Sequence, residues 1–124
     1  MIDFKNPEFI KLRPVSNEHF QKLLSKIMIE GEAIIASFQS VRDGIVFTDK
    51  RIISVNVQGV TGKKKDITSL PYKKIQVFSV ESSGVFDLDC ELVMYFSGLG
   101  HVRFEITGGY DVTQICKLIS DSVL

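Results

Sequence analysis

The sequence lacks an excess of charge and a long apolar run, and each absence excludes a class of protein. Fifteen basic and fifteen acidic residues cancel in a chain of 124, so no overall charge draws it to nucleic acid or to an anionic membrane. Any electrostatic partner must be recognised by a local patch. No run approaches the roughly 18 apolar residues of a membrane span. The first residues, M-I-D-F-K-N-P-E-F, lack the basic start and apolar core of a signal peptide. We therefore expect a soluble, cytoplasmic protein.

Groups that commonly bind metals or catalyse reactions are also scarce. The two cysteines, Cys90 and Cys116, are far apart and fall at apolar-face positions, so we interpret them as core thiols rather than a disulfide or a metal pair. Neither His19 nor His101 has a second histidine at metal-ligand spacing. The string G-V-T-G-K-K at 59–64 is too short for a phosphate-binding loop, and a strand rather than a helix is expected after it. We expect no metal, no cofactor and no catalytic site.

The length suits a single domain, with an N-terminal arm and helix over 1–32 and a β-rich part with a final helix over 33–124. Residues 2–15 form an apolar arm without a clear period. A helix is predicted to begin after Ser16, a good N-cap, and to stop at Gly31. Its apolar face has helical spacing and consists of Phe20, Leu23, Leu24, Ile27 and Met28.

From Ala33 to Ile106 the hydrophobic period becomes two, with turn signals about every ten residues. This pattern predicts a mainly β fold of seven antiparallel strands, in which neighbours in sequence pair as a meander. The expected strands are 33–40, 44–48, 51–58, 65–70, 74–82, 88–97 and 101–107. After Gly109 the helical period returns, with Asp111 as the expected N-cap and an apolar face of Val112, Ile115, Cys116, Ile119 and Val123.

The stretch I-V-F-T-D-K-R-I-I-S-V at 45–55 places three charges, Asp49, Lys50 and Arg51, between two apolar runs. Thr48 and Asp49 are residue types that hydrogen-bond nearby turn amides. A catalytic role would need a base or nucleophile that the segment does not contain. We therefore predict a tight turn between two core strands, with Arg51 in a structural ion pair with a carboxylate.

Two later segments separate the charges. Residues 63–74 carry five lysines and one aspartate, whereas residues 81–91 carry four acids and no base. The simpler interpretation is two solvated hairpin tips. The alternative is a head-to-tail contact between the basic hairpin of one molecule and the acidic hairpin of another. In that contact Val85 and Phe86 would be apolar anchors; otherwise Phe86 folds back onto its own barrel.

The strings F-T-D-K-R-I-I-S-V at 47–55, S-L-P-Y-K-K-I at 69–75 and S-V-E-S-S-G-V-F-D-L-D at 79–89 resemble segments of the bacterial pleckstrin-homology (PH) domain family. The resemblance implies two orthogonal sheets in a partly open barrel capped by the last helix. It also implies ring-like homo-oligomers of mostly unknown role. Eukaryotic relatives bind phosphoinositides with basic residues around the first hairpin. Here residues 40–44 offer one arginine beside one aspartate, so that lipid site is not carried over.

These observations favour a non-enzymatic PH-like domain that self-associates, in a ring-forming manner, as a protein-interaction scaffold with a further, unidentified protein partner. The candidate self-association residues are Val85, Phe86, Asp87, Asp89, Lys73 and Lys74. The alternative is a module that binds an anionic membrane surface or a phosphate ligand, since clustered lysines gain about 1 kcal/mol each near an anionic membrane. Its candidate residues are Lys63, Lys64, Lys65, Lys73 and Lys74.

Overall fold

The structure is a computed structural model that describes residue 4 and residues 11–82 and 89–124. Eight strands form one curled sheet in the order β5-β4-β3-β2-β1-β8-β7-β6. The strands are β1 (Lys11–Val15), β2 (Ile34–Ser40), β3 (Asp43–Thr48), β4 (Arg51–Gln58), β5 (Lys64–Pro71), β6 (Ile75–Ser82), β7 (Cys90–Phe96) and β8 (Gly100–Ile106). The helices are α1 (Gln21–Leu24), the short 3₁₀ helix η2 (Tyr72–Lys74) and α2 (Thr113–Val123).

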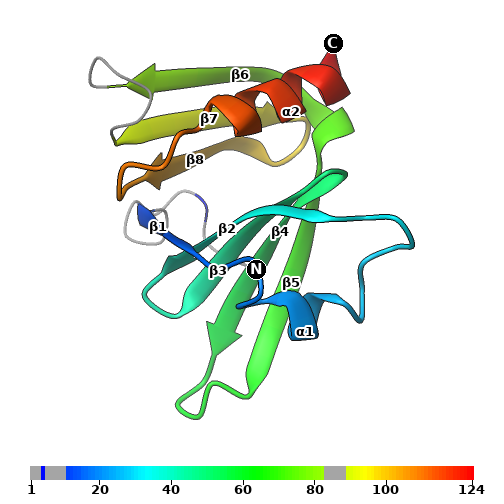
Figure 1. Ribbon diagram of the computed structural model, residues 1–124, viewed down its shortest axis with the longest axis vertical. Helices are drawn as coiled ribbons and strands as arrows, with labels where there is room; N and C mark the ends of the chain where they lie inside the picture. The colour runs from blue at the N-terminus through cyan, green and yellow to red at the C-terminus, as the bar shows by residue number, and fades with distance from the viewer. Residues whose placement is uncertain (1–3, 5–10, 83–88) are drawn as a thin grey trace.

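The sheet consists of two antiparallel meanders that β1 joins. Strands β2 to β5 pair in sequence order, as do β6 to β8. Strand β1 pairs antiparallel with β2 and parallel with β8. Figure 1 shows the two meanders one above the other, with α2 beside β6 and β7 at the upper end. The predicted mainly β, partly open barrel with a C-terminal helix is therefore confirmed. The predicted sequential pairing holds within each meander but fails between β5 and β6, which are consecutive in sequence and lie at opposite ends of the sheet order.

All seven predicted strands are present as β2 to β8, and β1 is an eighth strand that the sequence did not reveal. Only Leu12 of its five residues is buried, and Pro14 interrupts the apolar pattern. Its position is fixed by β2 and β8, since the backbone N–H and the hydroxyl of Thr107 both donate to the carbonyl oxygen of Leu12, at 2.8 and 2.9 Å. The side chain of Phe4 also belongs to the barrel core and makes an edge contact with Phe104. Part of the arm is therefore docked in the barrel.

The first helix is much shorter than predicted. It spans only Gln21–Leu24, and Ser16 accepts the backbone N–H of Glu18 in a turn before it. Phe20 and Leu24 of the predicted face are buried, but Ile27 is exposed. The chain leaves the helix after Leu24 because residues 27–32 bond to the β3–β4 turn, as described below.

Two apolar clusters explain why β3 and β4 are apolar on both faces. The barrel core faces the inside of the curled sheet and includes Phe47 and Ile52. A second cluster, which we call the outer cluster, packs Phe20 and Leu24 against the opposite face of β3 and β4. Strands that are buried on both faces carry continuous apolar runs, whereas strands with one solvated face alternate between apolar and polar residues. The run at 45–55 reflects this double coverage.

The C-terminal helix begins close to its predicted start. The side chain of Asp111 accepts the backbone N–H of Thr113 at 2.9 Å, and also the Thr113 hydroxyl. Ile115 and Ile119 are fully buried against the barrel core. Both cysteines are thiols in this packing, as predicted; Cys90 on β7 is buried and Cys116 on α2 is half-buried.

Candidate functional site

The charged triplet forms the predicted β3–β4 turn and anchors the segment before β2. The Thr48 hydroxyl accepts the backbone N–H groups of Lys50 and Arg51 at 3.1 and 3.0 Å. Asp49 exchanges two hydrogen bonds with the backbone of Ala33, one through its carboxylate and one through its own N–H. The three charges therefore close a turn, as the sequence indicated.

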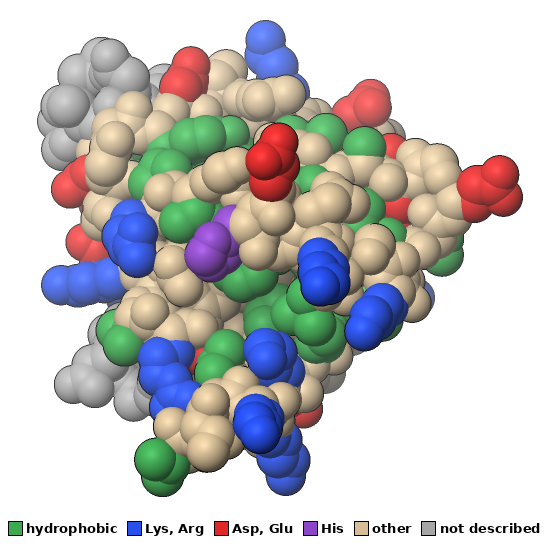
Figure 2. Space-filling view, turned by 60° about the horizontal axis from the view of Figure 1, so that its bottom comes forward, with side chains coloured by type: hydrophobic (Ala, Val, Ile, Leu, Met, Phe, Trp, Pro, Cys, Tyr) green, Lys and Arg blue, Asp and Glu red, His purple; other side chains and the backbone are tan. Residues whose placement is uncertain are grey.

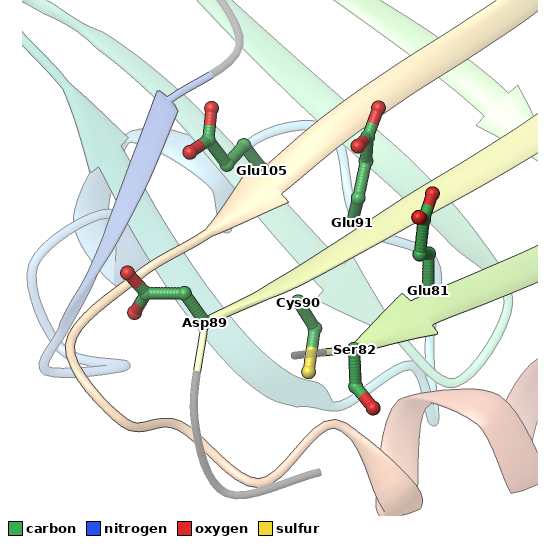
Figure 3. A pocket seen from close by; sticks show the side chains of 6 residues that line it. All are labelled: Glu81, Ser82, Asp89, Cys90, Glu91 and Glu105. Atoms are coloured by element: carbon green, nitrogen blue, oxygen red, sulfur yellow. The ribbon is translucent and has the colours of Figure 1, made fainter. Parts of the chain in front are cut away.

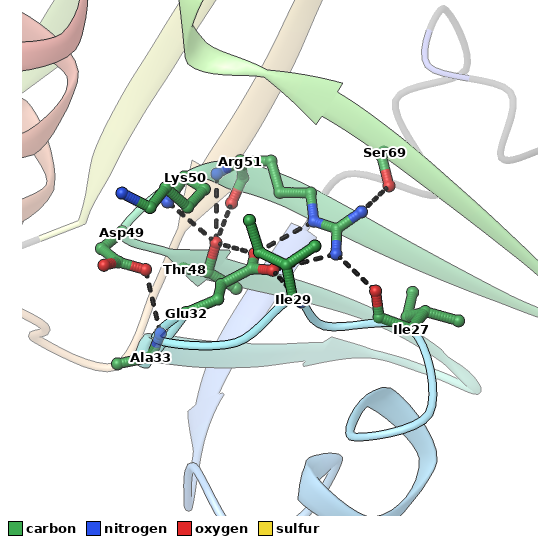
Figure 4. A network of polar contacts seen from close by, with 9 residues as sticks. All are labelled: Ile27, Ile29, Glu32, Ala33, Thr48, Asp49, Lys50, Arg51 and Ser69. Atoms are coloured by element: carbon green, nitrogen blue, oxygen red, sulfur yellow. Dashed lines mark hydrogen bonds and ion pairs between the residues drawn. The ribbon is translucent and has the colours of Figure 1, made fainter.

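Arg51 forms the structural ion pair that we expected, and its partner is Glu32 (Figure 4). The guanidinium donates two bonds to the two carboxylate oxygens, at 3.0 and 2.9 Å. It donates further bonds to the Ile27 carbonyl and the Ser69 hydroxyl, both at 2.9 Å. Arg51 thus joins the segment after α1 to β4 and β5.

Burial of Glu32 raises its pKa, but hydrogen bonds from Arg51, Thr48 and the backbone of Ile29 outweigh that effect and hold the pKa below its ordinary value. The Glu32 carboxylate accepts hydrogen bonds from Thr48 and Arg51, and its side chain has no exposed surface. The network therefore fits a structural role.

Basic residues gather at one end of the meander of β2 to β5, the lower of the two in Figure 1. We call this end the basic end. It consists of Arg42 in the β2–β3 turn and Lys63, Lys64 and Lys65 at the start of β5. The Arg42 guanidinium donates to the Gly59 carbonyl at 2.6 Å, so the two turns lie against each other. Figure 2 shows lysine and arginine side chains grouped at the lower edge of that view and most acidic side chains above them.

The five candidate lysines do not form one patch. Lys63, Lys64 and Lys65 lie where β5 begins, whereas Lys73 and Lys74 lie in η2, beyond its last residue. The eight residues of β5 span about 24 Å from first to last at about 3.4 Å per residue. An anion of ordinary size contacts one group or the other.

Acidic residues form a row across β6, β7 and β8, on the face of the sheet away from the barrel core. Strand register places Glu81 opposite Glu91 and Glu91 opposite Glu105. We call these three residues the acidic row. Figure 3 shows their side chains pointing to the same side of three adjacent strands, while Ser82 and Cys90 point the other way. Lys11 on β1 lies next to Glu105 in register, and Arg103 forms an ion pair with Glu91.

A shallow hollow of about 230 Å³ lies at the acidic row. It is lined by Glu81, Ser82, Asp89, Cys90, Glu91 and Glu105. Of the candidate self-association residues, Asp89 lies here, and Val85, Phe86 and Asp87 lie outside the described residues. Like charges directly opposite each other in a sheet are destabilising; within the chain, the ion pair of Arg103 with Glu91 and the position of Lys11 next to Glu105 offset part of that repulsion.

Some features of this surface were not found from the sequence. Glu105 joins the acidic row only through strand register, because it lies far from Glu81 along the chain. Asp43, which the sequence places beside Arg42, is buried and accepts the backbone N–H of Val57 at 2.8 Å. It therefore holds the turn and leaves Arg42 at the surface. No signal in the sequence shows whether an aspartate beside a turn arginine pairs with that arginine or, as here, accepts a backbone N–H.

Within residues 4, 11–82 and 89–124, histidine, cysteine and acidic side chains nowhere gather in the groups of three or more that would suit a metal ion. The helices of the same residues are all too short or too polar to cross a bilayer. The curled sheet and the helix on its open end define a β-barrel domain of the pleckstrin-homology class.

The chain belongs to the bacterial PH domain family, whose model matches residues 3–123. It is 54% identical over 84 residues to the uncharacterized protein YjqA of Bacillus subtilis, a match that covers 68% of this chain and 67% of that protein. It is also similar to the crystal structure of a protein with a pleckstrin-homology domain from Shewanella loihica. That match has 38% identity and a TM-score of 0.75, and covers 92% of this chain and 98% of the other.

A second solved structure, a pleckstrin-homology domain from Shewanella amazonensis, is 40% identical with a TM-score of 0.61, covering 89% of this chain and 90% of the other. These likenesses confirm the family that the strings at 47–55, 69–75 and 79–89 indicated.

Proposed function

We propose that the chain is a non-enzymatic, cytoplasmic PH-like domain that self-associates and serves as a protein-interaction scaffold. The observation that carries the proposal is the acidic row. Within the chain Arg103 pairs with Glu91 and Lys11 lies next to Glu105, and a basic surface of another copy would add positive charge at the exposed Glu81 end of the row. The same chain supplies that surface, because its total charge is balanced while its lysines are concentrated at the two ends of β5.

A contact between two different surfaces of identical chains is heterologous. It closes into a ring if the rotation between neighbours allows closure, and otherwise continues as a filament. Electrostatic complementarity contributes chiefly to the rate of association and to the choice of partner. The assembly should therefore form faster and more tightly at low salt than at high salt.

The test is light scattering behind size exclusion at micromolar concentration, at low and at high salt. We expect a discrete oligomer that salt weakens, and a strict monomer under all conditions would refute the proposal. Lys73→Glu and Asp89→Lys should each reduce the assembled fraction, and the double variant should partly restore it if those residues meet. Lys26→Glu, an equal change of charge at an exposed residue elsewhere, is the matched control.

A second candidate function is binding to an anionic membrane surface through the basic end. Val41 and Val60 lie in its two turns and are 87% and 104% exposed. Val41 has a φ of +46°, a conformation that β-branched residues rarely adopt. Apolar residues beside lysines suit a surface with an anionic outer layer and an apolar interior.

Vesicle co-sedimentation distinguishes this candidate from self-association. Vesicles rich in phosphatidylserine should retain the wild type at low salt and release a Val41→Ser, Val60→Ser double variant. No binding at low salt would refute membrane binding and leave self-association unaffected.

A further inference from the structure

The outer face of β6, β7 and β8 is uncovered, unlike the outer face of β3 and β4. On β3 and β4 the outer cluster buries this face under Phe20 and Leu24. On β6 to β8, within the part of the chain that the structure describes, no outward-facing side chain belongs to either apolar cluster. An exposed sheet face that still carries apolar side chains is a candidate interaction surface.

Such side chains form a row across the three strands at one end of this face. Strand register places Val77 opposite Tyr95 and Tyr95 opposite His101, and we call these three residues the exposed row. Val77 is 58% exposed and Tyr95 is 45% exposed. The rings of Tyr95 and His101 lie in contact, with their centroids 5.7 Å apart. Because tyrosine is enriched among the residues that dominate binding energy at interfaces, the row offers an anchor point for a partner.

Charge divides the outer face into two halves. The acidic row lies about 14 Å from the exposed row, since Glu91 and Tyr95 are four residues apart on β7 at about 3.4 Å per residue. Arg103 lies on β8 between the two rows and is paired with Glu91. Lys73 and Lys74 lie in η2, immediately before β6. Figure 1 shows η2 at the end of the β6–β8 meander where β7 turns into β8, so these two lysines border the half that carries the exposed row.

We propose that the exposed row binds a short acidic segment of a different protein, with an apolar side chain of that segment packed on Tyr95 and its carboxylates beside Lys73 and Lys74. Charge complementarity selects the acidic sign, because it governs the choice of partner at an interface. The exposed row supplies the apolar contact. This binding site goes beyond self-association, because one copy of the chain carries all of it.

The acidic row limits what this face can bind. A membrane surface or a nucleic acid presents its phosphates over a wide area. Either one, centred on Tyr95, would also place phosphates against Glu91 and its neighbours in the acidic row, and such like-charge contacts are unfavourable. A peptide segment of about four extended residues spans about 14 Å and fits between η2 and the acidic row. The occupant that suits this face is therefore a peptide segment.

Fluorescence anisotropy with labelled peptides and the full-length protein tests the proposal. The probe is a short peptide in which glutamate and leucine alternate. One comparison peptide has lysine in place of each glutamate, and the other has serine in place of each leucine. We expect the wild type to bind the glutamate–leucine probe about ten-fold more tightly than either comparison peptide, because the site needs both the acidic charge and the apolar contact.

Variants place the probe on the exposed row. Tyr95→Ala and the Lys73→Glu, Lys74→Glu double variant should each weaken binding of the glutamate–leucine probe by about ten-fold. Val60→Ser is the matched control, because Val60 is 104% exposed and lies beside the lysines of the basic end. It removes an exposed apolar side chain near lysines at another place on the molecule, and binding should stay unchanged.

Several results would overturn the proposal. These are no binding of the glutamate–leucine probe, tighter binding of the lysine peptide, and equal weakening by Val60→Ser and Tyr95→Ala. Vesicles of phosphatidylserine or a single-stranded oligonucleotide that bind the wild type but not Tyr95→Ala would show an occupant of another class.

Light scattering separates this site from self-association. If Tyr95→Ala lowers the assembled fraction, another copy covers the exposed row, so the peptide site is wrong and self-association stands. If the wild type is monomeric and binds the glutamate–leucine probe as expected, self-association is wrong and the peptide site stands.

Discussion

Replacing Glu32 by glutamine should destabilise the fold substantially, because it breaks a buried ion pair and leaves Arg51 without a counter-charge. The side chains of Glu32 and Arg51 are 0% and 20% exposed. Removing one partner of a buried pair costs about 3–5 kcal/mol. Arg51 keeps its bonds to the Ile27 carbonyl and the Ser69 hydroxyl and is partly solvated, so we expect a loss of about 2–3 kcal/mol of unfolding free energy.

The measurement is thermal and urea unfolding followed by circular dichroism. For a chain of this size, that loss lowers Tm by about 10 °C. Because the folded pKa of Glu32 lies below the ordinary value of 4.5, the carboxylate stabilises the fold above that pH, and the contribution is lost as the pH falls through the folded pKa. The difference between wild type and Glu32→Gln should therefore shrink below pH 4.5.

Glu30→Gln is the matched control, since Glu30 is exposed and close by in the chain. The reasoning is refuted if the two glutamine variants unfold alike at neutral pH. It is also refuted if the Glu32→Gln difference stays constant from neutral pH to pH 3.

Three further changes test other parts of the packing. Gly44→Ala should destabilise the fold by about 1–3 kcal/mol, because a Cβ at Gly44 would lie 2.3 Å from the Phe20 ring; adding Phe20→Ala should relieve that clash, and additive losses in urea unfolding would contradict this contact. Tyr72→Phe should cost about 1–1.5 kcal/mol in the same assay, since the fully buried hydroxyl donates to the Thr48 carbonyl at 2.6 Å; an unchanged midpoint would contradict that bond. Leu12→Ala should cost about 2–5 kcal/mol and speed hydrogen exchange in β1; if exchange there is already as fast in the wild type as in the unfolded chain, β1 is not part of the stable sheet.

The sequence predicted best the strands that have one solvated face. In β7, side chains such as Leu92 and Met94 face the core while Tyr95 is exposed, and alternation alone locates the strand. Strand β1 contributes one buried side chain, Leu12, in five residues, so no local period marks it. Its place depends on β2 and β8, and pairing between distant strands is invisible in one short segment.

The helix length was overestimated for a different reason. Helical spacing over 20–28 is real, because Phe20 and Leu24 do pack on the outer face of the sheet. The chain then leaves the helix as the Ile27 carbonyl accepts Arg51 and Glu32 pairs with it. A tertiary contact here overrides local propensity.

For the site, the sequence separated the charges correctly but could not place them in space. It treated 63–74 as one basic hairpin, whereas Lys65 and Lys73 lie at opposite ends of β5. It found Glu81 and Glu91 but missed Glu105, which only strand register brings beside them. The anchors Val85 and Phe86 fall outside the described residues, and their role stays a prediction.

The covering of β3 and β4 on both faces has a consequence for how this protein can change over evolution. Every residue of β3 is buried, so we expect substitutions at any of its positions to destabilise the fold. On the outer face of β6 to β8, Val77, Tyr95 and His101 form an exposed row, and each can vary without disturbing either apolar cluster. Saturation mutagenesis should therefore show β3 as nearly intolerant of substitution, while the outer face of β6 to β8 accepts changes from which new binding specificities can arise.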